Sequence, residues 1–135
     1  MKTIELPVDT HAEGITELTD QVRAFCVGLG DGLLNVFAPH STVGLALIQA
    51  DEGAGQDIIE AINRLIPRTY DYHHREKSAG HGADHVLPVL VSPTLVIPVV
   101  DGAPLLGLFQ HVVLIDLDQD PSDRRVRLTF VGEST

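Results

Sequence analysis

Histidine is the residue type through which this sequence could most readily do chemistry. The chain has 135 residues, of which 7 are histidine. His40 closes an apolar segment, whereas His73, His74, His81 and His85 lie in or at the edge of one polar stretch. Imidazole binds metals near neutral pH, and three such ligands leave a coordination position open for water or substrate. The spacing is no local metal signature, so solvated loop histidines are the alternative interpretation.

One pair of these histidines has helical spacing. His81 and His85 are four residues apart, which on a helix would place both on one face. Gly80 and Gly82 disfavour a helix there, because glycine loses more backbone entropy than other residues on entering a helix. We therefore treat this HxxxH pair as a weak signal and leave open whether His73 or His81 joins a site.

Two adjacent basic residues, Arg124 and Arg125, precede the last apolar segment. Together they could hold a phosphate through bidentate hydrogen bonds. Pairing with nearby carboxylates is equally consistent with the sequence, the candidates being Asp116, Asp118, Asp120 and Asp123.

Three other motifs are rejected. The acidic run that starts at Asp116 has Pro121 where a calcium-binding EF-hand requires Gly, and Arg127 where it requires Glu. Ser41 lies in no G-x-S-x-G nucleophile elbow. Cys26 falls on the apolar stripe of a predicted helix, which indicates a buried thiol.

The charge balance limits the classes of partner. A net charge of −10 with only 9 Lys and Arg argues against nucleic acid and favours cations, including divalent metals. Because there is 1 cysteine, a metal site must use His and carboxylate ligands. No apolar run approaches the roughly 18 residues of a membrane span, and the N-terminus lacks a signal-peptide apolar region. We expect a cytoplasmic protein without membrane contact.

Hydrophobic periodicity predicts the elements that would position these residues. Apolar stripes predict one helix over residues 18–29, with Thr16 as its N-cap, and a second over residues 58–66, ended by Pro67. Strands are expected at residues 2–8, 33–39 and 42–49. The polar stretch 68–84 predicts a long loop, and such loops in compact domains are usually functional or disordered.

The remainder of the chain is predicted to be β-rich. Strands are expected at residues 86–91 and 95–100, with one or two more over 106–117. Val126, Leu128 and Phe130 alternate with polar residues, the period of a strand with one buried face. The pattern predicts an α+β fold: an antiparallel β-sandwich of about seven or more strands with two helices, in a single domain over residues 1–135.

Taken in order, these features resemble the YjbQ-like family, also called the secondary thiamine-phosphate synthase family, over nearly the whole chain. The motifs that carry the resemblance are His40-Ser41-Thr42 ahead of an apolar strand, Asp51-x-Gly53 with Asp57, Tyr72-x-His74, His85, Val96-Ile97-Pro98-Val99, Gly102, Gly107-Leu108-Phe109-Gln110, Arg124-Arg125 and Gly132-Glu133.

The resemblance implies a homotrimer that binds a divalent metal, with zinc as the first candidate, through His40, His74 and His85. It places this site in a cleft near the subunit boundary. It also implies weak thiamine-phosphate synthase activity, in which a pyrimidine diphosphate joins a thiazole phosphate and pyrophosphate is released. The residues expected to contact substrate or phosphate are Ser41, Thr42, Gln110, Arg124 and Arg125.

The chain departs from the family pattern in three places. Gln49 stands where many members carry Glu, Leu108-Phe109 replaces Thr-Trp, and His81 replaces the Asn of an N-A-D-A-H motif. The missing Glu removes a candidate general base. A non-catalytic trimeric module that binds a metal or an anion is therefore the alternative to a weak synthase.

Overall fold

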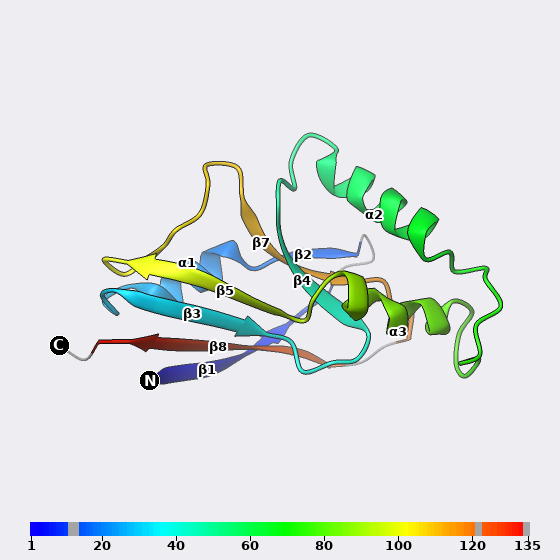
Figure 1. Ribbon diagram of the computed structural model, residues 1–135, viewed down its shortest axis with the longest axis horizontal. Coiled ribbons are helices and arrows are strands. Elements are labelled where there is room, and N and C mark those ends of the chain that lie inside the picture. The colour runs from blue at the N-terminus through cyan, green and yellow to red at the C-terminus, as the bar shows by residue number, and fades with distance from the viewer. Residues whose placement is uncertain (11–13, 121–122, 134–135) are drawn as a thin grey trace.

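Two antiparallel sheets form the body of the protein in the computed structural model, which describes residues 1–10, 14–120 and 123–133 (Figure 1). The larger sheet has five strands in the order β1-β8-β3-β5-β6, and the smaller has three in the order β2-β7-β4. The strands are β1 (Lys2–Val8), β2 (Ile15–Glu17), β3 (Gly32–Phe37), β4 (Val43–Ile48), β5 (Thr94–Val100), β6 (Ala103–Pro104), β7 (His111–Asp116) and β8 (Arg124–Gly132).

Three helices accompany the sheets: α1 (Thr19–Cys26), α2 (Ala54–Leu65) and α3 (His81–Leu90). The predicted α+β fold with an antiparallel two-sheet body is therefore confirmed. The first two helices match the predicted apolar stripes, but Thr16 is not an N-cap, because it lies in β2 and the cap position of α1 is Leu18. Within the described residues, no helix is long and apolar enough to cross a membrane.

The small sheet lies between two hydrophobic cores. On β7, Val112 and Leu114 face the core shared with the large sheet, whereas Val113 and Ile115 face a second core that includes Ile62 of α2 and Leu87 of α3. The order of layers is thus large sheet, small sheet, then α2 and α3. A strand covered on both faces must be almost continuously apolar, which explains the sequence of β7.

The first core closes around α1 and the last strand. Val126, Leu128 and Phe130 of β8 are buried, as their period-2 pattern predicted. Cys26 is fully buried in the same core, and burial raises the pKa of its thiol. The prediction of a buried core thiol is therefore confirmed.

Helix α3 corrects two predictions, because the sequence indicated a strand over residues 86–91 and a loop that continued to Asp84. The two glycines allow close packing at the start of this helix. Gly80 lies just outside it at φ +84°, and a Cβ there would meet the Arg68 guanidinium at 2.6 Å. A Cβ on Gly82 would lie 2.5 Å from the Cβ of Tyr72.

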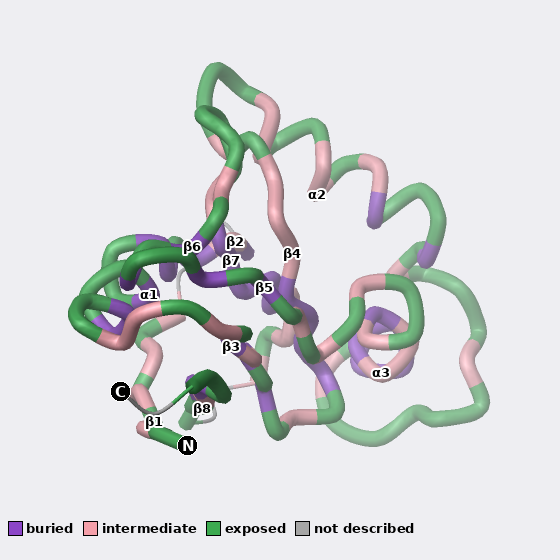
Figure 2. Tube along the Cα trace, turned by 60° about the vertical axis from the view of Figure 1, so that its left-hand side comes forward, coloured by how far each residue is buried: buried purple, intermediate pink, exposed green. Residues whose placement is uncertain are grey.

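The C-terminal end of α3 lies directly against β4. A Cβ on Gly44 would fall 2.2 Å from the carbonyl oxygen of Val91, so only glycine fits at this point of the strand. The Leu45 N–H also donates to the Ser92 carbonyl at 2.8 Å. Figure 2 shows several buried positions on α3, whereas α2 carries exposed and intermediate positions and buries Ile62. These contacts fix α3 relative to the small sheet.

Candidate metal and anion site

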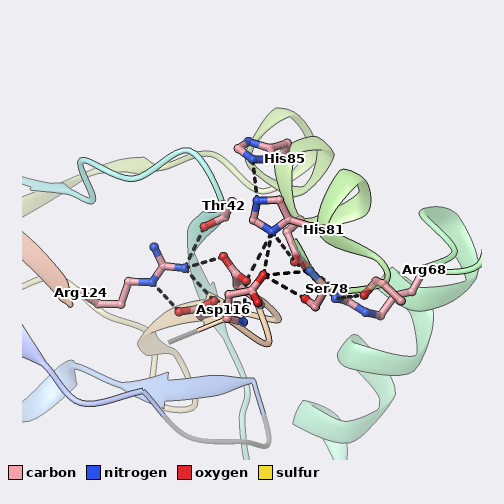
Figure 3. A network of polar contacts seen from close by, with 11 residues as sticks. Thr42, Arg68, Ser78, His81, His85, Asp116 and Arg124 are labelled. Carbon is pink, nitrogen blue, oxygen red and sulfur yellow. Dashed lines mark hydrogen bonds and ion pairs between the residues drawn. The ribbon is translucent and has the colours of Figure 1, made fainter. Parts of the chain in front are cut away.

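Four chain segments converge beside the start of α3. Strand β4 begins just after Ser41 and Thr42, β7 ends at Asp116, and Asp116 pairs in register with Val43. Strand β8 begins at Arg124. The loop between α2 and α3 returns to the same place, so polar groups from distant parts of the sequence meet here (Figure 3).

Three histidines form a cluster at this convergence. His74 comes from the loop, and His81 and His85 come from the first turns of α3. A ring nitrogen of each lies within 4.8 Å of those of the other two. The Nε2 atoms of His81 and His85 are 3.1 Å apart. The ring centroids of His74 and His85 are separated by 4.6 Å.

The opposite nitrogen of His81 faces carboxylates. Its Nδ1 lies 3.4 Å from Asp120 Oδ2 and 3.6 Å from both Asp84 Oδ2 and Asp118 Oδ1. The side chain of His81 is only 5% exposed, and among the described residues Nδ1 has no hydrogen-bond partner. Figure 3 shows His81 between His85 on one side and these acidic groups on the other.

Arg124 is the centre of a buried ion-pair network. Its Nε donates to Asp116 Oδ2 at 2.7 Å, and its Nη2 donates to Thr42 Oγ1 at 2.8 Å. The same Nη2 lies 3.3 Å from Asp118 Oδ2. Although burial raises the pKa of Asp118, hydrogen bonds from the Asp120 N–H and the Thr42 hydroxyl lower it below its ordinary value overall.

A second arginine ties the long loop to α3. The Arg68 Nη1 donates to Asp84 Oδ1 at 2.6 Å, and its Nη2 donates to the Ala79 carbonyl. At the other end of the loop, the Ser78 hydroxyl donates to Asp120 Oδ2 at 2.9 Å. These contacts hold the segment that carries His74 against the helix that carries His81 and His85.

Two histidines of the site, His85 and His40, have a lowered pKa. Burial lowers the pKa of His85, and the neighbouring His81 and His74 lower it further. Burial, followed by the Arg124 charge, lowers the pKa of His40. Neutral imidazole presents a lone pair to a metal ion, so these pKa shifts favour ligation near neutral pH.

Several residues predicted from the sequence line one open cavity of about 320 Å³, together with His81, Lys77 and the acids Asp118 and Asp120. They are His40, Ser41, Thr42, His85 and Arg124.

His40 stands apart from the three-histidine cluster, although the resemblance made it a ligand. Its Nε2 accepts a hydrogen bond from the Arg125 N–H at 3.0 Å. His74 lies on an adjoining cavity, which is also lined by His81.

Two of the predicted contact residues lie away from this cavity. Arg125 alternates with Arg124 along β8, so its side chain points outward, where it pairs with Glu5. Gln110 precedes β7 at the end opposite Asp116, and its side chain accepts from the Gly107 N–H. The six residues of β7 separate Gln110 from the site, a distance of about 20 Å along the strand. Gln49, beyond β4, is exposed at that same distant end.

A second polar group at that distant end was not predicted. His111 Nδ1 lies 2.9 Å from Glu17 Oε1, and its Nε2 lies 3.3 Å from Asp51 Oδ2. The hydrogen bond to Glu17 raises the pKa of His111. A larger cavity of about 680 Å³ opens beside Glu17 and Asp51. Both nitrogens of His111 already face carboxylates, so it is less suited to ligation than the three-histidine cluster.

The fold and the histidine cluster define an α+β protein with a polar site at the end of its small sheet, and comparisons with known proteins assign its family. The family model described as UPF0047 protein YjbQ-like matches residues 2–133. A UPF0047 protein of Mycobacterium tuberculosis is 50% identical over 131 residues, which cover 97% of this chain and 98% of the relative. A UPF0047 protein of Archaeoglobus fulgidus is 34% identical over 83% of this chain and 86% of the relative.

Solved structures agree with this assignment. A hypothetical protein from Aeropyrum pernix superposes with a TM-score of 0.88 at 29% identity, covering 98% of this chain and 100% of the other. A YjbQ/UPF0047-family protein from Clostridium acetobutylicum gives a TM-score of 0.85 at 27% identity, covering 95% and 99%. The chain belongs to the YjbQ-like UPF0047 family.

Replacing Arg124 tests the buried network. Arg124→Gln leaves Asp116 and Asp118 buried without their guanidinium, so we expect a loss of about 3 kcal/mol or more in the free energy of unfolding. Its neighbour provides the matched control, because the side chain of Arg125 is 56% exposed and Arg125→Gln should change stability little. Urea unfolding of both variants measures the difference, and equal losses would contradict the role given to Arg124.

Proposed function

We propose that the chain is a divalent-metal-binding protein whose ligands are His74, His81 and His85, with zinc as the favoured ion. The convergence of the three imidazoles carries this proposal. A tetrahedral zinc ion with Zn–N bonds of 2.0–2.1 Å separates its ligand nitrogens by about 3.3 Å. The 3.1 Å between the Nε2 atoms of His81 and His85 is close to that value.

The ligand set differs from the one that the resemblance implied. His74 and His85 belong to both sets, but His81 takes the place of His40 as the third imidazole. His40 lies across the shared cavity, where it would face a bound molecule rather than the ion. Zinc tolerates this arrangement, because three histidines are a sufficient protein ligand set and leave one position open.

A metal at this position would act as a Lewis acid or lower the pKa of a bound water. The chain's own groups would orient the bound molecule. Ser41 and Thr42 offer hydroxyls to the cavity, and Lys77 offers a solvent-exposed ammonium. Arg124 is already bound to Asp116, Asp118 and Thr42, so its main part would be to hold the Thr42 hydroxyl in place.

The histidine positions can be tested one by one through metal affinity. His74→Ala should weaken zinc binding by at least about 100-fold, because it removes a direct ligand and changes outside the ligand set already cost 10–100-fold. His73→Ala is the matched control, since it removes the adjacent exposed histidine and should leave affinity unchanged. Isothermal titration of the chelator-stripped protein at pH 7.5 gives both values. Equal affinity of the two variants would refute the assigned ligand set.

A transferase reaction is the catalytic form of this proposal. The cavity that would hold the metal is also lined by Lys77, Ser41 and Thr42, groups that can bind a phosphorylated small molecule. Thiamine-phosphate synthesis, in which a thiazole phosphate displaces pyrophosphate from a pyrimidine diphosphate, is the reaction that the family resemblance implies. The proposed metal and Lys77 would have to neutralise the leaving pyrophosphate.

A direct assay tests this reaction. Purified metal-loaded protein given both substrates should form thiamine phosphate, whereas His85→Ala should reduce the rate to background because it removes a ligand. Product is measured by chromatography after conversion to its fluorescent oxidised form. If the wild type forms no more product than His85→Ala, the synthase proposal fails.

A non-catalytic metal-binding module is the second candidate, and the charges at the cavity favour it. Asp118 and Asp120 line the cavity and would repel a pyrophosphate group, while the Arg124 charge is already paired. In that case metal would stabilise the fold without turnover. The synthase assay separates the two candidates, since both require metal binding.

We also propose that three copies of the chain associate through the outer face of the large sheet. Apolar side chains on adjacent strands are exposed there, and their register places them together: Leu33, Phe37, Val96, Val100 and Val131. A contiguous apolar patch on a sheet face is typical of a protein–protein contact.

A charge on this face should disrupt the assembly. We expect the wild type to have the mass of a homotrimer in sedimentation equilibrium and Val96→Glu to have the mass of a monomer, because the carboxylate would be buried between copies. Val27→Glu is the control, since Val27 is 73% exposed at the end of α1. A monomeric wild type would contradict the proposal.

A further inference from the structure

The buried Nδ1 of His81 has no partner that the described structure supplies. The side chain is 5% exposed, yet no described residue makes a hydrogen bond with this atom. Buried polar atoms in native proteins nearly always have a partner, and an exception calls for an explanation such as an ion. Because the opposite nitrogen faces His85, this explanation must come from the acidic side of the ring.

The carboxylates around Nδ1 are spaced as ligands of a shared cation. The distances of 3.4 Å to Asp120 and 3.6 Å to both Asp84 and Asp118 exceed the 2.7–3.2 Å of an N–H···O hydrogen bond. A tetrahedral ion with bonds of 2.0–2.2 Å holds its ligand atoms about 3.3–3.6 Å apart. Of these atoms, Nδ1 and oxygens of Asp84 and Asp118 all lie within 4.8 Å of one another, so these three leave a space that suits an ion rather than a direct contact.

These carboxylate oxygens retain capacity for an ion. Asp118 Oδ1 accepts from the Asp120 N–H at 2.9 Å, and Asp120 Oδ2 accepts from the Ser78 hydroxyl at 2.9 Å. Asp84 Oδ2 accepts from Arg68 at 3.3 Å. Each carboxylate oxygen has two lone pairs, so one remains for a cation on Asp118 Oδ1 and on Asp84 Oδ2. Asp120 Oδ2 also accepts from the Ser78 N–H at 3.5 Å, so both of its lone pairs are used.

The charges of the network also call for a cation. The carboxylates of Asp84, Asp116, Asp118 and Asp120 face the guanidinium groups of Arg68 and Arg124, which leaves two negative charges uncompensated. The exposed fractions of these carboxylates run from 1% for Asp84 to 28% for Asp120, and charges taken out of water must be paired. Lys77 lines the cavity but is exposed to solvent. One divalent cation at Nδ1 would restore neutrality.

We propose that His81 bridges two divalent cations, one at Nε2 with His74 and His85 and one at Nδ1 with Asp84 and Asp118. The ion at Nε2 rests on the proposed function, whereas the ion at Nδ1 rests on the unpartnered nitrogen and the carboxylates beside it. Binding at both nitrogens displaces the ring N–H proton to solvent. The two ions would lie about 6 Å apart, given M–N bonds of about 2.0–2.1 Å on each side of the ring.

Metal stoichiometry tests the bridge. The full chain is stripped with chelator, dialysed against Zn²⁺ and measured by mass spectrometry of the metal, with thermal unfolding as a folding check. We expect two zinc ions per wild-type chain and one for Asp118→Asn. Asp123→Asn is the matched control, because it removes an exposed carboxylate of the same acidic segment that does not face His81, and it should retain two. If Asp118→Asn does not fold, Asp84→Asn removes the other carboxylate at Nδ1 and should also bind one.

A second readout reports the bridge itself. Cu²⁺ ions joined through one imidazolate couple magnetically, so the copper-loaded wild type should give an EPR signal well below that of two isolated ions. Asp118→Asn should give the full signal of one ion. A full two-ion signal in the wild type would overturn the bridge.

The outcomes separate this inference from the proposed function. One zinc in both the wild type and Asp118→Asn, lost in His74→Ala, overturns the second site and leaves the proposed function intact. One zinc that is lost in Asp118→Asn and retained in His74→Ala overturns the proposed function and the bridge, and places the ion at the carboxylates. No zinc in the wild type overturns both.

Discussion

The pairing of buried charges around His81 is the constraint on which the site depends. Arg124 joins the start of β8 to the end of β7 through Asp116, and Arg68 joins the end of α2 to α3 through Asp84. A buried carboxylate that loses its partner is strongly destabilising, so these pairs admit few alternative arrangements of the segments. The His74 loop, the first turns of α3 and the Thr42 turn are therefore brought to one point by electrostatics, while the layered cores beneath them supply most of the burial.

The histidine cluster and the charge network share one residue, His81. The site therefore has a histidine side and an acidic side, which this ring connects. His81 presents one nitrogen to His85 and the other to carboxylates, so an ion on the histidine side would feel the negative potential of the acids through a single ring. Carboxylates beyond a ligating imidazole orient the ring and strengthen its ligation. The same negative potential opposes the binding of pyrophosphate, which is why metal binding is the part of the function that the site supports best.

The sequence predicted much of the scaffold and less of the site. The period-2 pattern of β8 and the apolar stripes of α1 and α2 were sufficient, because each of these elements buries one face. Helix α3 was missed, since Gly80 and Gly82 disfavour a helix, and it also contains Pro88. Gly80 and Gly82 are required by close contacts with Arg68 and Tyr72, which no local pattern reveals. The spacing of His81, Asp84 and Leu87, all buried on one side of α3, was the available signal. The sequence left two interpretations of Arg124, phosphate binding and pairing with nearby carboxylates, and the structure shows the pairing. Which carboxylate it would choose could not be told from the sequence.

Whether His81 is a metal ligand is tested most directly by a crystal structure of the zinc-loaded protein with anomalous data at the zinc edge. We expect an anomalous peak within bonding distance of Nε2 of both His81 and His85 and of a ring nitrogen of His74. A peak bound by His40, His74 and His85 that leaves His81 uncoordinated would contradict it, as would the absence of any peak at the cluster.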